Sequence, residues 1–266
     1  MSVAWSRVGN RLALGVEPID AVSGLRVARP IHVDVERPGL AWLREDREGF
    51  ARAAGRGRAP ISRHETGRHA MIMRDDLGES VQLRIYDRRR GFVPRRLAIP
   101  LPLAAEIATA PRIRRPVLFP GVAWDLIGGS TALRSRVRRA GQPVRWARLE
   151  GRRPGEPEVL LRSRADDRGE FLLVLGVATL AQAELEGQFE LEVEAFGPPA
   201  AMVPPSEGDA LDPLWDLPVE TLAAPGVDDP VALGEGPPPV GWISLGSASL
   251  TFELGRTLSD QASLDF

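Results

Sequence analysis

The sequence contains no cysteine and no lysine. The absence of cysteine excludes disulfides, thiolate metal ligands and cysteine nucleophiles, and it is typical of a cytoplasmic protein. The absence of lysine excludes a P-loop lysine, a kinase-type lysine and a Schiff-base lysine. All 34 cationic side chains other than histidine are therefore arginine. A GC-rich genome explains this more simply than a need for bidentate arginine contacts.

Long apolar runs and aromatic residues are also scarce. No stretch reaches the roughly 20 apolar residues of a membrane-spanning helix, and residues 1–10 lack the apolar core of a signal peptide. Aromatic residues make up 6% of the 266 residues, whereas 43% are hydrophobic and 26% are charged. This is the balance of a globular protein. We therefore expect a cytoplasmic protein with no membrane span and with room for two domains.

Recognisable catalytic and cofactor motifs are missing as well. His64 and His69 lie five residues apart with Gly67 between them, whereas a zincin helix needs two histidines four residues apart. The chain has no Gly-x-Ser-x-Gly elbow and no glycine pattern for a dinucleotide. Asp166 and Asp167 alone supply too few oxygen donors for a calcium loop. We expect a protein that is not an enzyme and that needs no cofactor and no metal.

The charges present are divided unevenly along the chain. Residues 1–168 contain 33 arginines and 19 acidic residues, a net charge of +14. Residues 169–266 contain one arginine and 17 acidic residues, a net charge of −16. Such halves can meet inside one molecule or between neighbouring copies. Nucleic acid is not the expected partner, because the acidic half repels phosphate and few aromatic residues accompany the arginines. The expected partners are other protein subunits, with self-association as one form.

Apolar and polar residues alternate in many short segments between turns. The clearest segment is 188–196, in which glutamates alternate with apolar residues. Similar segments lie at 31–36, 81–86, 131–137 and 144–150. This pattern predicts an all-β fold of two small Ig- or transthyretin-like β-sandwich domains in tandem. Only residues 40–54 have helical spacing, and we predict one short helix or an irregular arm there.

The turn and linker composition predicts three regions. Residues 1–110 are expected to form a basic N-terminal sandwich, and residues 111–225 a second sandwich. Residues 226–266 are rich in proline and glycine near their start. We expect them to form a C-terminal arm with one or two strands that complete another sheet.

The second region resembles the carboxypeptidase regulatory-like family, whose members are small transthyretin-like β-sandwich modules. The resemblance covers 130–175 and rests on the segment 133–137, the turn at 141–144, the strand through Ala147 and the turn at 166–171. The chain departs from the family at Ala165, where threonine is frequent, and at Leu149, where valine is usual. The resemblance implies a sandwich that serves as a structural or binding module.

The layout of two modules joined by residues 115–121 also resembles proteins associated with phage-tail-like contractile injection systems. That resemblance implies a cap, baseplate or accessory component of a large symmetric particle. The expected function is therefore a non-enzymatic structural or adaptor subunit. Its extended arms would lie along neighbours, and residues 248–254 would add a strand to a neighbouring sheet.

Two groups of charged residues are the candidates for contacts with partner subunits. The acidic group is the outward face of the segment 188–196, formed by Glu190, Glu192 and Glu194. The basic group is the densest arginine patch, formed by Arg88, Arg89, Arg90, Arg95 and Arg96.

A carbohydrate- or other ligand-binding sandwich is the alternative function. Sugar rings stack on exposed aromatic platforms, for which the chain offers several tryptophans spread along its length. These candidate platforms are Trp42, Trp124, Trp146, Trp215 and Trp242.

Overall fold

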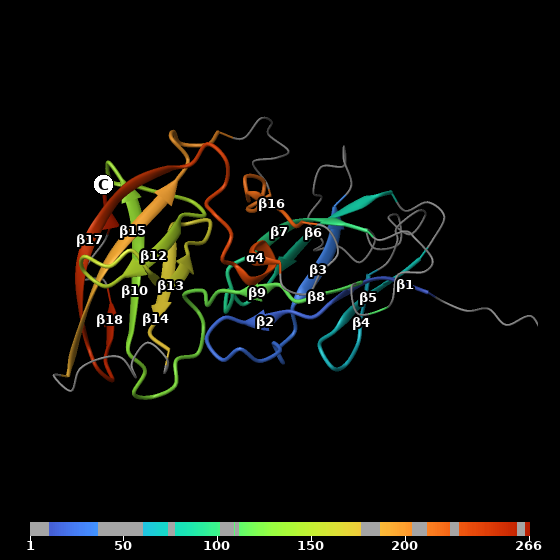
Figure 1. Cartoon of the computed structure of the whole chain (residues 1–266), viewed down its shortest axis with the longest axis horizontal. Coiled ribbons are helices and arrows are strands. Elements are labelled where there is room, and N and C mark those ends of the chain that lie inside the picture. Colours follow the sequence, from blue (N-terminus) through green and yellow to red (C-terminus); the bar gives the residue numbers. More distant parts are fainter. Residues whose placement is uncertain are drawn as a thin grey trace, which may run out of the picture.

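The computed structural model describes residues 11–36, 61–73, 78–101, 109, 112–176, 187–203, 212–223, 229–259 and 264–266. These residues form β-strands and one short helix, α4 (Pro230–Leu233) (Figure 1). The predicted all-β fold is therefore confirmed. The helix predicted at 40–54 lies outside the described residues. Within those residues, no helix is long and apolar enough to cross a membrane.

Two four-stranded sheets share the core of the first sandwich. Their strand orders are β4-β5-β1-β8 and β16-β7-β6-β3, and a separate parallel pair joins β2 to β9. The strands are β1 (Leu12–Val16), β2 (Ile19–Asp20), β3 (His32–Glu36), β4 (Ile61–Arg63), β5 (His69–Ile72), β6 (Ser80–Tyr86), β7 (Arg95–Pro100), β8 (Ile113–Arg114), β9 (Val117–Leu118) and β16 (Val219–Thr221). Leu14 and Met71 from one sheet and Leu83 and Leu97 from the other are fully buried in this core.

The second sandwich also has two sheets. In one, β10 pairs with β11, β14, β18 and β19, and the other has the order β13-β12-β15-β17. The strands are β10 (Ala132–Arg139), β11 (Gln142–Pro143), β12 (Arg148–Arg152), β13 (Val159–Arg164), β14 (Glu170–Val174), β15 (Gln188–Gly197), β17 (Ile243–Glu253), β18 (Thr257–Ser259) and β19 (Leu264–Asp265). Phe171 and Val137 from the first sheet pack in one core with Leu191 and Phe252 from the second.

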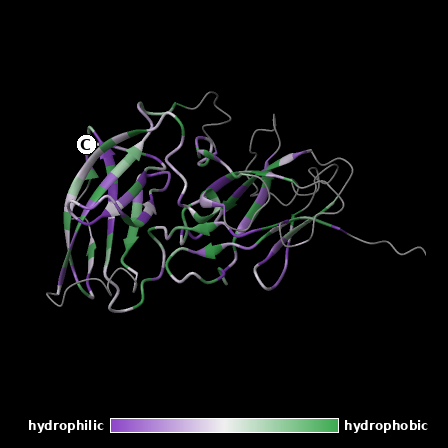
Figure 2. Cartoon of the chain, viewed as in Figure 1, coloured by the Kyte–Doolittle hydropathy of each residue, from purple (hydrophilic) through white to green (hydrophobic). Residues whose placement is uncertain are grey.

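Strands β15 and β17 form the longest pairing of the fold. They are antiparallel and match ten residue pairs, from Gln188 opposite Glu253 to Gly197 opposite Ile243. The predicted alternation is observed, because Leu191 is buried and Glu190 is exposed. Figure 2 shows the same alternation of hydrophobic and hydrophilic positions along the strands of both sandwiches.

The sheets do not follow the predicted boundaries at residues 110 and 225. Strands β8, β9 and β16 lie within 111–225, but they pair with β1, β2 and β7 and so complete the first sandwich. The predicted C-terminal arm instead supplies β17, β18 and β19 to the two sheets of the second sandwich. These three strands pair with β10 and β15. Phe252 and Leu264 of this segment are buried in the core of the second sandwich, whereas Ala232 of α4 is buried in the core of the first.

Candidate functional site

A cluster of three arginines around one glutamate joins the two sandwiches. Glu220 on β16 accepts hydrogen bonds from Arg95 on β7 at 3.0 and 2.9 Å. It also accepts two from Arg164 on β13, at 2.6 and 2.8 Å, and one from Arg148 on β12, at 3.0 Å. Figure 1 shows β16 and α4 between the second sandwich and the strands β6 and β7. One carboxylate therefore ties a sheet of the first sandwich to a sheet of the second.

The side chains of this cluster are almost completely removed from water. The exposed fraction is 0% for Arg95, 5% for Glu220, 8% for Arg164 and 12% for Arg148. Desolvation opposes ionisation of Glu220, but Arg164 and Arg95 outweigh it and hold the pKa of that carboxyl well below its ordinary value. Burial and the neighbouring Arg164 lower the pKa of Arg148 to about 9. The cluster is thus rich in cations and depends on its single carboxylate.

The predicted basic patch is divided between the interior and the surface. Arg95 is fully buried, so a docking role for this residue is excluded in the folded chain. Arg96 is partly buried and donates to Glu36 at 2.6 Å, and Arg90 is ion-paired with Asp167. Only Arg88 and Arg89 are exposed. No local pattern in the sequence predicts that Arg95 is buried, because its partner Glu220 lies 125 residues away.

The predicted acidic group lies on the outer face of the second sandwich. Glu190 and Glu192 are exposed and accept hydrogen bonds from Ser249 and Ser247 of β17, at 3.1 and 2.9 Å. Glu194 is less exposed and accepts a hydrogen bond from Arg152 at 2.9 Å. The first two carboxylates therefore face solvent beside β17.

Some acidic residues of the C-terminal half pair with arginines of the first half inside the molecule. Besides Glu220 and Glu194, several acidic residues of the C-terminal half are bound by arginines of the first half or by backbone N–H groups. Asp212 is ion-paired with Arg84, and Asp216 with Arg145. Asp229 accepts hydrogen bonds from the N–H groups of Val231 and Ala232 at the start of α4 and from that of Ala223, and its charge favours the cation of Arg114. The complementary halves thus meet within one chain at these positions.

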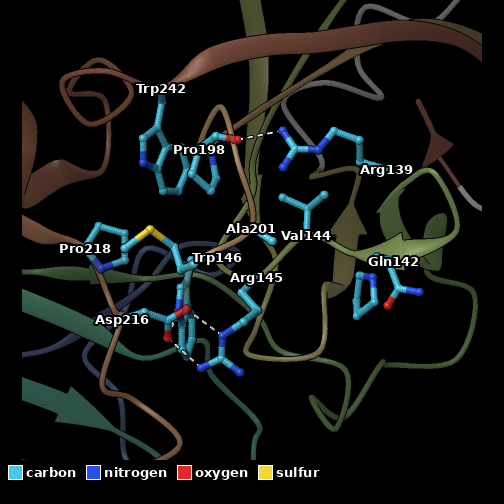
Figure 3. Close-up of a pocket in the computed structure, with 12 residues that line it drawn as sticks. Arg139, Gln142, Val144, Arg145, Trp146, Pro198, Ala201, Asp216, Pro218 and Trp242 are labelled. Atoms are coloured by element: carbon cyan, nitrogen blue, oxygen red, sulfur yellow. Dashed lines mark hydrogen bonds and ion pairs between the residues drawn. The ribbon is translucent and has the colours of Figure 1, made fainter. Parts of the chain in front are cut away.

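A pocket of about 300 Å³ lies beside the segment that joins β11 to β12 in the second sandwich (Figure 3). It is lined by segments far apart in sequence: residues 139–146, 198–202 and 216–218, and Trp242. Eight of its twelve lining residues are apolar, among them Trp146 and Trp242. Two of the predicted tryptophan platforms are therefore brought together, although Trp146 is only 5% exposed. Trp124 and Trp215 do not line this pocket, and Trp42 lies outside the described residues.

Asp216 fixes one wall of this pocket. Its carboxylate, which is 0% exposed, accepts two hydrogen bonds from Arg145 at 2.6 and 2.5 Å and one from the indole N–H of Trp146 at 2.8 Å. Arg145 also lies over the Trp146 ring, 5.4 Å from its centre. These contacts hold Trp146 in a backbone conformation with φ of +61°, which is uncommon for a bulky residue.

His64 and His69, the two histidines nearest each other in the sequence, each contact another group of the protein. His64 lies in the turn before β5 and binds Thr66, at 3.0 Å from its hydroxyl. His69 begins β5, is buried, and lies 3.2 Å from the carbonyl oxygen of Ile31. Among the described residues, no three histidine, aspartate or glutamate side chains are grouped closely enough to hold a metal ion.

Comparisons with known proteins leave the family of this chain open. No family model matches the sequence, and no curated protein matches it. A solved structure of the Bacillus anthracis TIE protein is similar with a TM-score of 0.23 and 8% sequence identity. The match covers 95% of this chain and 34% of that protein, so the chain spans about a third of its length. A similarity this weak carries no argument about fold or function.

Proposed function

We propose that this chain is a non-enzymatic structural or adaptor subunit of a larger protein assembly. The observation that supports this proposal best is the edge strand β17. It ends the sheet β13-β12-β15-β17, so the backbone groups along its outer side have no strand partner among the described residues. An open edge of this kind is a template for a strand of another chain.

Strand β17 has few of the features that protect sheet edges. It is 11 residues long, and its residues 243–252 contain no proline and no charged side chain. Short strands, prolines and charges are the usual protection against pairing between sheets. On its core-facing side Phe252 is buried, so the strand is held in register by β15 while its outer edge stays available.

The acidic side chains beside this edge indicate the kind of strand it would accept. Glu190 and Glu192 lie on β15 and hydrogen-bond to serines of β17 on the exposed face. A strand added to β17 would lie about 10 Å from β15, close to the screening length of about 8 Å, so the two carboxylates still attract basic residues on it. A partner strand with basic residues on that face therefore fits best. Such complementarity mainly sets association rate and orientation.

The exposed Arg88 and Arg89 are the second proposed contact. They lie in the first sandwich, so contacts at both sandwiches would place the subunit between two neighbours of a symmetric assembly. In its finer form, the proposal is a cap, baseplate or accessory component of a phage-tail-like contractile injection particle. This form rests on the sequence resemblance, and sheath, tube or baseplate genes beside its own gene would support it.

The proposal is tested by sedimentation from the native source. A tagged chain carrying Glu190→Lys and Glu192→Lys should be about tenfold depleted from fast-sedimenting particles, because two reversed charges repel a basic partner strand at the nearby edge. A loss of about 1.4 kcal/mol corresponds to that factor. The matched control is Glu156→Lys, since Glu156 is a half-exposed glutamate whose contact, with Arg153, is local. The pair Arg88→Glu and Arg89→Glu tests the second contact in the same gradient.

Two results would contradict the proposal. If the wild-type chain sediments only as a 28.9 kDa monomer in its native source, it is not an assembly subunit. If the wild-type chain enters particles and both double variants enter them equally well, neither proposed surface makes the contact.

A further inference from the structure

The pocket beside Trp242 is used by no part of the function proposed above. Its walls are mainly apolar and come from Val144, Pro198, Met202, Pro218 and the two tryptophans (Figure 3). Its volume of about 300 Å³ is at the lower limit of ligand sites, which span roughly 300 to 1,000 Å³. A cavity of this size has room for one large apolar side chain or for a small organic molecule.

The surroundings of the pocket distinguish between these two occupants. Five exposed hydrophobic side chains, each at least 40% exposed, lie within two residues of a lining residue. They are Met202, Val203, Val219, Val240 and Ile243. A small molecule inside the cavity would leave these side chains in water. Exposed apolar side chains next to a pocket favour a protein partner, whose anchor residue the pocket would take.

Arg139 gives the occupant a charge preference. Its guanidinium donates a hydrogen bond to the carbonyl oxygen of Pro198 at 2.8 Å, and no carboxylate pairs with it among the described residues. By contrast, Arg145 on the opposite wall is neutralised by Asp216 (Figure 3). A carboxylate next to the anchor would give Arg139 an ion-pair partner that the described residues do not supply.

We propose that this pocket receives a large apolar side chain of a partner subunit, with a neighbouring carboxylate of that subunit paired to Arg139. The inference rests on the proposed function, because it assigns the pocket to a contact within the same assembly. A glycan is the competing occupant. Eight of the twelve lining residues are apolar, which favours an apolar side chain over a hydroxylated ring.

The chemistry of the pocket is tested first, with defined probes and the full chain labelled with ¹⁵N. N-acetyltryptophan should shift the indole N–H signals of Trp146 and Trp242 in a saturable way, with the latter assigned from Trp242→Phe. N-acetyltryptophanamide, which lacks the carboxylate, should bind about threefold more weakly. Arg139→Gln should remove that difference, and Ala201→Trp, which fills the pocket from its rim, should abolish both titrations.

Three results would overturn the chemical assignment. They are the absence of a saturable shift at about 10 mM probe, equal affinity for the acid and the amide in the wild-type chain, and a response to glucose or maltose alone. The last result would identify a glycan site.

The partner assignment is tested in the native particle. Ala201→Trp should deplete the chain from fast-sedimenting particles at least fivefold, whereas the same substitution at the remote exposed Ala21 should not. If Glu190→Lys with Glu192→Lys depletes the chain but Ala201→Trp does not, the proposed function stands and the pocket inference is wrong. If the wild-type chain never enters particles but N-acetyltryptophan binds, the proposed function fails and the pocket is a site for a free ligand.

Discussion

Glu220 is the one carboxylate of the described residues that pairs with three almost completely buried arginines. It accepts hydrogen bonds from Arg95, Arg148 and Arg164, all of which are almost completely buried. Removing one member of a buried ion pair costs more than the pair itself contributes, because the remaining charge stays desolvated. The loss of stability should be larger at Glu220, since this carboxylate pairs with three cations. Removing one arginine should cost less than removing Glu220, because the carboxylate then still pairs with the other two arginines.

Glu220→Gln should therefore lower the free energy of unfolding by about 3–5 kcal/mol. Arg148→Gln should cost clearly less, because it also removes repulsion between Arg148 and Arg164. Urea unfolding followed by circular dichroism measures both. Because the pKa of Glu220 is depressed, its contribution is complete above the ordinary pKa of 4.5 and is lost as the pH falls below it. The variant should lose the corresponding part of the acid sensitivity. An equal cost for the two substitutions would contradict this account.

The turn between β13 and β14 shows how one element depends on its backbone geometry. Asp166 accepts hydrogen bonds from the N–H groups of Arg168 and Glu170 at 2.8 and 3.0 Å. Gly169 has φ of +72°, and a Cβ there would lie 2.7 Å from the carbonyl oxygen of Val137. Only glycine fits this position, because the obstructing atom belongs to the backbone of a core strand.

Gly169→Ala should lower the free energy of unfolding by about 2–4 kcal/mol, from the strained φ and the steric clash together. Gly141→Ala is the matched control, since Gly141 has φ of +76° but no atom within 4 Å of its Cβ position. Gly141→Ala should lower the free energy of unfolding by about 1 kcal/mol, because it introduces only the backbone strain. Thermal unfolding of both variants separates the two contributions. A cost at Gly169 no larger than that at Gly141 would show that Val137 moves away freely.

The sequence predicts single strands and turns of this fold better than it predicts which strands pair. The alternation of 188–196 predicts β15, and the turn at 166–169 is found where its Asp and Gly place it. The pairing of β16 with β7 joins Val219 to Arg96 with no local signal in either segment. For the same reason the run of arginines at 88–96 suggests one surface, although Arg95 is in the interior. The pocket joins Trp146 to Trp242, which no spacing rule connects.

Each sandwich of the whole molecule is completed by segments from beyond the predicted boundaries. A fragment of residues 112–225 lacks β17, β18 and β19, which pair with β15 and β10. It should show no cooperative unfolding transition, since the core would be exposed beside β15. A fragment of residues 129–266 keeps every strand of the second sandwich and should unfold cooperatively in urea. If residues 112–225 fold alone, the sheet order does not describe the cooperative unit.

The pairing of β15 with β17 also means that β15 is synthesised well before the strand that it pairs with. Leu250 lies opposite Leu191 but follows it by 59 residues. At about 5–20 residues per second, a ribosome needs roughly 3 to 12 s to add that length. During this interval β15 has one strand edge without its native neighbour, and contacts of such long sequence separation form slowly. The nascent chain is therefore open to pairing with other chains before its own C-terminal strand arrives, so its yield should depend on synthesis rate and on chaperones.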